Sequence, residues 1–211
     1  MPTNEWNKGW ATNLAQYNRG EIKCKHYGDQ WGDPEIQSHL TQVVNRFIKP
    51  FVDQSVIALE IGPGGGRWTQ YLLSCKKIYC VELNPEMFAY LKKRFSGKKH
   101  IRYIQTSGSD FPGVPEQSID FAFTFGTFVH LDFDIIRNYI RNMTRIMRHN
   151  GNISIQFSNK KKEMAENNPD FSDNSPDKMV QLLDDFCFDV VEVDDELLPH
   201  STIIAGKYRG V

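Results

Sequence analysis

Long apolar stretches are missing from this chain of 211 residues: no run approaches the roughly 18 consecutive apolar residues that span a membrane. The first residues, MPTNEWNKGW, lack the basic segment and apolar core of a secretory signal. Charge of one sign is not in excess either, because 25 basic and 26 acidic side chains give a formal net charge of -1. We therefore expect a cytoplasmic protein with no membrane or nucleic-acid partner, although a local basic patch is compatible with this balance.

Cysteine is also scarce. None of the four cysteines has a partner at CxxC spacing, and no pair of histidines completes a zinc-binding pattern. We therefore expect reduced thiols and no metal site. The length fits one domain with a small appendage. The polar and aromatic residues 1–35 are predicted to form that appendage, as a lid or a wrapping segment, and residues 36–211 form the domain.

Short apolar runs alternate with helical patterns along the chain. Helical periodicity indicates helices over residues 36–49, 86–95, 133–149 and 176–186, with Gly151 ending the third. Seven runs are typical of buried strands: 55–61, 77–83, 100–105, 119–125, 152–157, 188–194 and 201–208. This alternation predicts a doubly wound α/β sheet that is mostly parallel. Residues 195–200 are too few for a helical crossover, so the last strand is expected to run antiparallel to the one before it.

The most informative segment is ALEIGPGGGRW (58–68), which follows a predicted strand and precedes a predicted helix. It places Glu60, Gly62, Gly64 and Gly66 at alternate positions. Glycines let a chain turn tightly and let a ligand approach bare backbone. A dinucleotide fingerprint, G-x-G-x-x-G, would need a third glycine where Arg67 stands, and no GxxxxGK[ST] phosphate loop is present. The loop therefore predicts a cofactor without a pyrophosphate.

A second acid, Glu82, ends the second predicted strand, twenty residues beyond Gly62. A carboxylate at this point can accept two hydrogen bonds from a ribose diol. We therefore expect a cofactor that carries a ribose and an adenine-like ring.

The E-x-G-x-G-x-G loop, Glu82 and a sheet that ends in a hairpin together resemble the class I S-adenosylmethionine-dependent methyltransferases, over about residues 36–210. The resemblance implies a Rossmann-like fold, S-adenosylmethionine as cofactor, and residues 36–211 as the methyltransferase domain. It places Glu60 near the methionine amino group, and it places the three alternating glycines of the loop beneath the cofactor.

Further cofactor contacts follow from the same resemblance. Glu82 would accept the ribose hydroxyls, and Leu83 would lie against the adenine. The family often carries an aspartate after its third strand, whereas this chain reads QTSGSDFPGV (105–114). The adenine contact therefore passes to Gly108 or Ser109. Phe125, at the end of the fourth strand, is a further predicted cofactor contact.

The fourth strand ends in Thr124-Phe125-Gly126, where amino-directed nucleic-acid methyltransferases carry [DNS]PP[YF], so methylation of nucleic-acid amino groups is disfavoured. His130 follows this strand and is the candidate general base, because an imidazole titrates near neutral pH. A structural alternative for His130 is to orient its loop. Asp132 either orients His130 or caps the next helix.

Together these features predict methyl transfer to a small molecule, with a hydroxyl of a sugar or similar polar metabolite as acceptor. An N-methyltransferase of a small amine and a non-catalytic cofactor-binding module are the alternatives. A nicotinamide oxidoreductase is disfavoured by Arg67. The polar residues 158–175 follow the fifth strand on the ligand side, and their KKK run is expected to be solvated.

Overall fold

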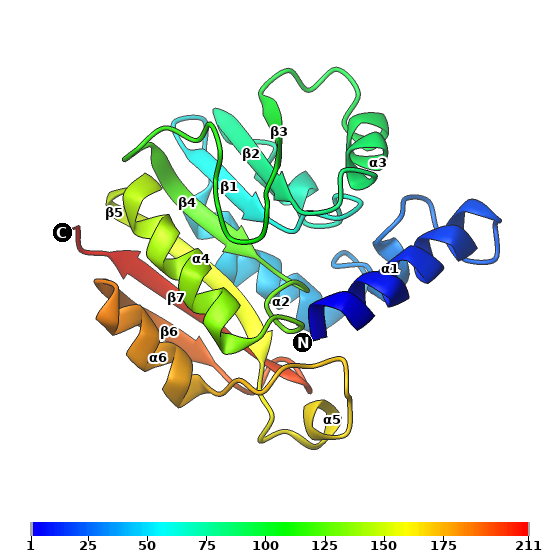
Figure 1. The fold of residues 1–211 in the computed structure, drawn as a ribbon. Helices are drawn as coiled ribbons and strands as arrows, with labels where there is room; N and C mark the ends of the chain where they lie inside the picture. The colour runs from blue at the N-terminus through cyan, green and yellow to red at the C-terminus, as the bar shows by residue number, and fades with distance from the viewer. Residues whose placement is uncertain (1, 211) are drawn as a thin grey trace.

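The computed structural model describes residues 2–210, and the side chains of residues 10–210. A seven-stranded sheet forms its centre in the order β3-β2-β1-β4-β5-β7-β6 (Figure 1). Strand β7 runs antiparallel to both of its neighbours, and the other pairs are parallel, as the sequence predicts. The strands are β1 (Ile57–Ile61), β2 (Lys77–Glu82), β3 (Ile101–Gln105), β4 (Ile119–Thr124), β5 (Met147–Ser158), β6 (Phe188–Asp194) and β7 (Ser201–Tyr208).

Helices cover both faces of the sheet. The α-helices are α1 (Pro2–Asn18), α2 (Ser38–Phe47), α3 (Met87–Arg94), α4 (Phe133–Ile146), α5 (Glu163–Glu166) and α6 (Pro176–Asp185). Short 3-10 helices are η1 (Asp29–Trp31), η2 (Lys49–Phe51) and η3 (Thr69–Leu72). Apolar side chains of α4 and α6 form one core cluster with the sheet, and those of α2, η3 and α3 form the other. No helix among residues 2–210 is both long and apolar enough to cross a bilayer.

Two helix predictions are wrong in detail. The glycine loop leads into the single 3-10 turn η3, which replaces the predicted helix. The helix predicted to run to residue 149 ends at Ile146, because Met147 turns to extended backbone and pairs with Ile119 of β4. This pairing buries the Met147 side chain completely. As a result His149 and Gly151 lie inside β5, and neither ends a helix.

The N-terminal segment is ordered around one tyrosine. Tyr27 is 1% exposed, and its hydroxyl donates to Asn13 Oδ1 of α1 over 3.0 Å. The Tyr27 ring also meets the rings of Trp10 and Trp31, with centroids 5.5 and 5.6 Å away. Aromatic pairs at such distances each add about 0.5–1.5 kcal/mol to the energy of burial. These contacts hold α1 against η1, next to the edge of the sheet where a ligand would bind.

Candidate active site

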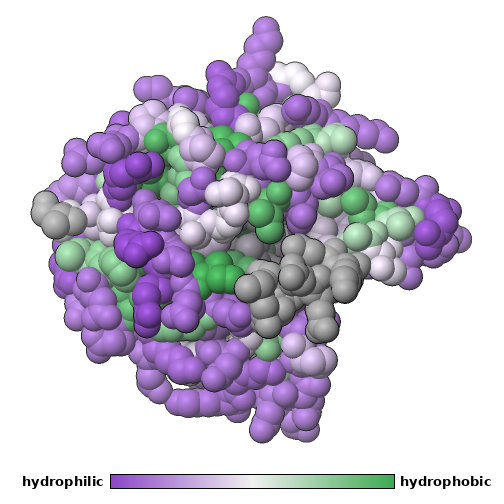
Figure 2. Space-filling view, viewed as in Figure 1, coloured by the Kyte–Doolittle hydropathy of each residue, from purple (hydrophilic) through white to green (hydrophobic). Residues whose placement is uncertain are grey.

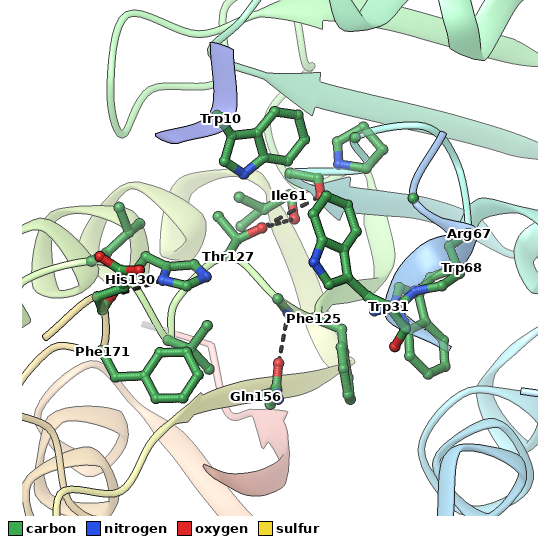
Figure 3. Close-up of a pocket in the computed structure, with 18 of the residues that line it drawn as sticks. Trp10, Trp31, Ile61, Arg67, Trp68, Phe125, Thr127, His130, Gln156 and Phe171 are labelled. Carbon is green, nitrogen blue, oxygen red and sulfur yellow. Dashed lines mark hydrogen bonds between the residues drawn. The ribbon is translucent and has the colours of Figure 1, made fainter. Parts of the chain in front are cut away.

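A cavity of about 630 Å³ lies at the carboxyl ends of β1, β2 and β4. Its volume falls within the range of small-molecule sites. Figure 2 shows hydrophobic side chains around the hollow near the centre of the molecule. Figure 3 shows that aromatic rings line the cavity on several sides, from Trp10 and Trp31 to Phe171. A parallel sheet binds ligands at this edge, where its loops leave a crevice.

The glycine loop forms one wall of the cavity, and two of its glycines are required by close contacts. A Cβ atom on Gly62 would lie 1.9 Å from the hydroxyl oxygen of Thr127, and the backbone of Gly62 also has a φ of 69°. A Cβ atom on Gly65 would lie 1.7 Å from the carbonyl oxygen of Tyr27. Side chains at these positions would therefore push apart the loop, the N-terminal segment and the turn after β4.

The alternating glycines predicted to lie beneath the cofactor differ in their positions. Gly62 and Gly64 line the cavity, and Gly64 lies against the Trp10 ring. Gly66 is not among the lining residues. Its missing side chain instead leaves room for Phe95, since a Cβ atom there would lie 2.5 Å from that ring. Gly66 is therefore placed to support the packing of α3 behind the loop.

Glu82 lines the cavity at the end of β2 and is almost fully buried. Its two carboxylate oxygens accept the backbone N–H groups of Gly64, at 3.2 Å, and Asn84, at 3.0 Å. Burial raises the pKa of Glu82, while the backbone N–H groups around the carboxylate lower it. The carboxylate thus holds the glycine loop from within the cavity wall.

Glu60, by contrast, lies behind the glycine loop and is not among the lining residues. Its carboxylate is 2% exposed and accepts the Thr69 hydroxyl at 2.6 Å. Burial raises the pKa of Glu60 to about 7, and the Thr69 hydrogen bond and the charge of Arg94 lower it in part. A role for this acid at the methionine amino group stays a prediction.

Of the remaining predicted cofactor contacts, some line the cavity and one does not. Leu83, Gly108 and Phe125 line the cavity. Ser109 does not line it, and its carbonyl instead accepts the Asn142 side chain at 2.8 Å. Of the two alternatives for the adenine contact, the structure brings Gly108 to the cavity.

His130 lines the cavity on the side opposite Trp31 (Figure 3). Its Nδ1 lies 2.8 Å from the Asp170 carbonyl oxygen. A carbonyl oxygen can only accept a hydrogen bond, so Nδ1 carries the proton and Nε2 has the lone pair. Burial lowers the pKa of His130 to about 4, so the ring is neutral at pH 7. Asp132 occupies the N-cap position of α4, although its side chain makes no capping hydrogen bond.

A family model described as a methyltransferase domain matches residues 59–155, which hold the glycine loop, Glu82 and His130. This match covers a little under half of the chain, and together with the solved structures described below it supports the class I S-adenosylmethionine-dependent methyltransferase family. The same findings support enzymatic methyl transfer with S-adenosylmethionine as the cofactor. The fold predicted from the sequence is thereby confirmed, and the predicted family and cofactor are supported.

Solved structures share this fold at low sequence identity. An S-adenosylmethionine-dependent methyltransferase from Aquifex aeolicus has a TM-score of 0.63 and 18% identity, over 83% of this chain and 98% of that one. A second, from Mesorhizobium loti, has a TM-score of 0.68 and 10% identity, over 82% and 99%. A Dictyostelium discoideum protein named "Probable dimethyladenosine transferase" is 39% identical over 70 residues. That match covers 30% of this chain and 22% of the relative's length.

The site of this methyltransferase fits the cofactor on two observations. The loop offers bare backbone to the cavity at Gly62 and Gly64. Glu82 also presents a buried carboxylate in the cavity wall, and a carboxylate can accept hydrogen bonds from a ribose diol. Among the described side chains, no group of three or more His, Cys, Asp or Glu residues could hold a metal ion.

The N-terminal segment of the methyltransferase is fixed to the glycine loop by two arginines. The guanidinium of Arg94 pairs with Asp29 at 2.8 Å and donates to the Gly65 carbonyl at 3.2 Å. Arg67 donates to the carbonyl oxygen of Trp31 at 2.7 Å. This arrangement holds the Trp31 ring over the cavity. The aromatic composition of residues 1–35 indicated a cover, but sequence spacing gave no sign of the two arginine contacts.

The turn after β4 is held by Gln156, a residue that the sequence did not single out. Its side-chain oxygen accepts the Gly126 N–H at 2.6 Å, and its side-chain nitrogen donates to Ser201 of β7 at 2.8 Å (Figure 3). Thr127 joins the same turn to the glycine loop by donating to the Ile61 carbonyl at 3.3 Å. The only available signal was a polar glutamine inside an apolar strand segment.

The polar residues 158–175 form another wall of the cavity. The expectation that the KKK run is solvated is wrong for two of its lysines. The Lys160 ammonium donates to the Ala165 and Asn168 carbonyls, and that of Lys162 donates to the Leu198 and Ser201 carbonyls. Of the run, Lys161 alone is exposed. These contacts stabilise the loop and so place Phe171 at the cavity, where its ring stacks on His200 at 5.0 Å.

Proposed function

We propose that this methyltransferase transfers a methyl group from S-adenosylmethionine to a hydroxyl of a small molecule, such as a sugar or a similar polar ring. The observation that carries the proposal is one continuous cavity that contains both Glu82, on the cofactor side, and His130, on the far side. Trp10 and Trp31 line this cavity, which supports a role for residues 1–35 as a lid on the domain of residues 36–211.

The lining of the cavity supports a hydroxylated ring as acceptor. Trp31, Phe125 and Phe171 offer flat apolar surfaces. His130 and His200 flank Phe171, and burial lowers the pKa of both imidazoles. Neutral imidazoles bind hydroxyl groups as donors or acceptors without requiring a charge on the ligand. An acceptor with apolar ring faces and hydroxyls at its rim fits such a lining.

His130 is suited to take the proton of the acceptor hydroxyl at Nε2, because its Nδ1 is committed to the Asp170 carbonyl. When bound, S-adenosylmethionine supplies a methyl carbon on a positively charged sulfur, and the electrons of the broken C–S bond stay on that sulfur. The cavity walls align the two reactants, which supplies about 7–11 kcal/mol of the barrier reduction. A general base adds about 10²–10⁴-fold. The low pKa of His130 places its contribution at the lower end of that range.

Transfer of a labelled methyl group tests the proposal. Hydroxylated sugars, aromatic alcohols, small amines and total RNA serve as acceptors, with RNA included because a relative carries a dimethyladenosine transferase name. We expect label in a hydroxylated compound, and we expect His130→Ala to slow its transfer by about 10²-fold with unchanged affinity for S-adenosylhomocysteine.

Other outcomes would contradict the proposal. Label in amines alone, with full activity in His130→Ala, would indicate an N-methyltransferase. Label in RNA would replace the small molecule with a nucleic acid. Tight binding of S-adenosylhomocysteine without transfer to any acceptor would favour a non-catalytic module.

A further inference from the structure

A strongly basic face lies beside α3, outside the lining of the methyl-transfer cavity. Its exposed side chains come from the segment after α1, from the last turn of α3 and from the residues that follow it. We call this the basic face, and it consists of Lys23, Lys25, Lys92, Lys93, Lys98, Lys99 and Arg102. None of these seven cations forms an ion pair with another residue of the described part of the chain.

The charge of the chain is concentrated here. Residues 19–29 and 84–102 hold nine basic and three acidic side chains, whereas all other residues hold 16 basic and 23 acidic ones. Two of the three acids are already paired, Glu21 with Arg19 and Asp29 with Arg94. The formal charge of -1 therefore results from a positive face and a negative remainder. In Figure 2 hydrophilic side chains project from the top of the molecule, where Figure 1 draws the segment between α3 and β3.

Aromatic rings are interleaved with these cations. A second cavity, of about 510 Å³, lies between the segment after α1 and α3. Lys23, Lys25 and Lys93 line it together with Tyr17 and Tyr90. Cationic grooves with aromatic rings bind single-stranded nucleic acids, because the cations neutralise phosphates and the rings stack on bases.

The basic face lacks the features that a membrane surface requires. The exposed large hydrophobic side chains of the described residues are Trp31, Ile36, Leu83, Met164, Val180, Val191 and Val193. None of them comes from residues 19–29 or 84–102, so this face has no apolar group to insert into a bilayer. The tyrosine rings, by contrast, can stack on the planar bases of a nucleic acid.

We propose that the basic face binds a single-stranded polynucleotide through its phosphates. This inference goes beyond the proposed function, because the face is separate from the methyl-transfer cavity and its binding needs neither cofactor nor acceptor. It departs from the expectation of no nucleic-acid partner, although a balanced total charge is compatible with a local basic patch.

The test measures the affinity of the full chain for a fluorescent oligouridine of about 16 nucleotides, by anisotropy at several salt concentrations. With about five phosphates neutralised, the logarithm of affinity falls against the logarithm of salt with a slope of about -3.5. This slope corresponds to about a 10²-fold loss between 50 and 200 mM salt. The double variant Lys93→Gln, Lys98→Gln removes two cations, so its slope is expected near -2.1.

The matched control is the double variant Lys49→Gln, Lys207→Gln, which neutralises two exposed lysines outside the basic face and is expected to keep the wild-type slope. No oligouridine binding at 50 mM salt, or an equal loss in both double variants, would overturn the proposal. Equal or tighter binding of anionic lipid vesicles or polyglutamate would also overturn it. An unchanged affinity of each variant for S-adenosylhomocysteine shows that its fold and its methyl-transfer cavity are intact.

Discussion

Replacing Glu82 with alanine changes the cofactor site at the point where its geometry is best defined. The carboxylate has about four acceptor positions, and the Gly64 and Asn84 N–H groups occupy two of them. We predict that the carboxylate also accepts hydrogen bonds from the ribose diol. Hydrogen bonds to a charged group contribute about 1.5–3 kcal/mol. At 1.4 kcal/mol for each factor of ten, S-adenosylhomocysteine is expected to bind Glu82→Ala about 10- to 150-fold more weakly.

Titration calorimetry with S-adenosylhomocysteine measures this loss. Glu82→Gln keeps an oxygen for a backbone amide but removes the charge, so its affinity is expected between those of wild type and Glu82→Ala. Glu86→Ala removes a nearby exposed acid that does not line the cavity, and it is expected to bind as wild type does. Wild-type affinity in a folded Glu82→Ala protein, judged by its circular dichroism and unfolding midpoint, would refute the ribose assignment.

Three further predictions concern buried charge. Burial raises the pKa of Glu60 from 4.5 to about 7, so the stability that its neutral form contributes is present below pH 4.5 and is lost as pH rises through 7. In urea unfolding, the free energy of unfolding of Glu60→Gln relative to that of wild type should therefore rise by about 3 kcal/mol from pH 4.5 to pH 7. A difference between the two proteins that does not change with pH would contradict the raised pKa. Burial lowers the pKa of His130 from 6.5 to about 4, so its stability is present above pH 6.5 and is lost as pH falls through 4. In the same assay, the free energy of unfolding of His130→Phe relative to that of wild type should therefore rise by about 3 kcal/mol from pH 7 to pH 4, and a difference that does not change with pH would contradict the lowered pKa. Arg94→Gln breaks a buried ion pair with Asp29 and should cost about 3 kcal/mol and expose residues 20–35 to protease, whereas Arg137→Gln, in an exposed pair, should cost under about 1 kcal/mol. Equal costs in the two variants would show that the Asp29 pair does not hold the N-terminal segment.

Much of the sheet could be predicted from the sequence because its strands are buried on both faces. The nearly continuous apolar runs 77–83 and 119–125 are typical of strands that are buried on both faces. The antiparallel final pair also followed, since residues 195–200 cannot contain a crossover helix. Helix ends were less predictable. The Met147–Ile119 pair that stops α4 joins residues far apart in the chain, and helical periodicity does not detect such a pair.

In the functional site, too, some residues could be predicted from the sequence and others could not. Glu82 and the glycine loop were predictable because a ligand that approaches bare backbone demands glycine and an acid at set spacing. The sequence could not predict that Gly66 and Ser109 lie outside the cavity, because their positions depend on how α3 and α4 pack behind the loops. Gln156 was missed, since its two partners lie on other elements.

The sequence by itself determined the strand pattern and predicted the family and the cofactor, because each depends on residue type at short, fixed spacing. Only the tertiary structure decided which residues enclose the cavity. Trp31, His130 and Phe171 come from three distant segments, and arginine, carbonyl and lysine contacts across the chain hold them around one cavity. Those contacts depend on the folded geometry, and a linear pattern does not encode them residue by residue.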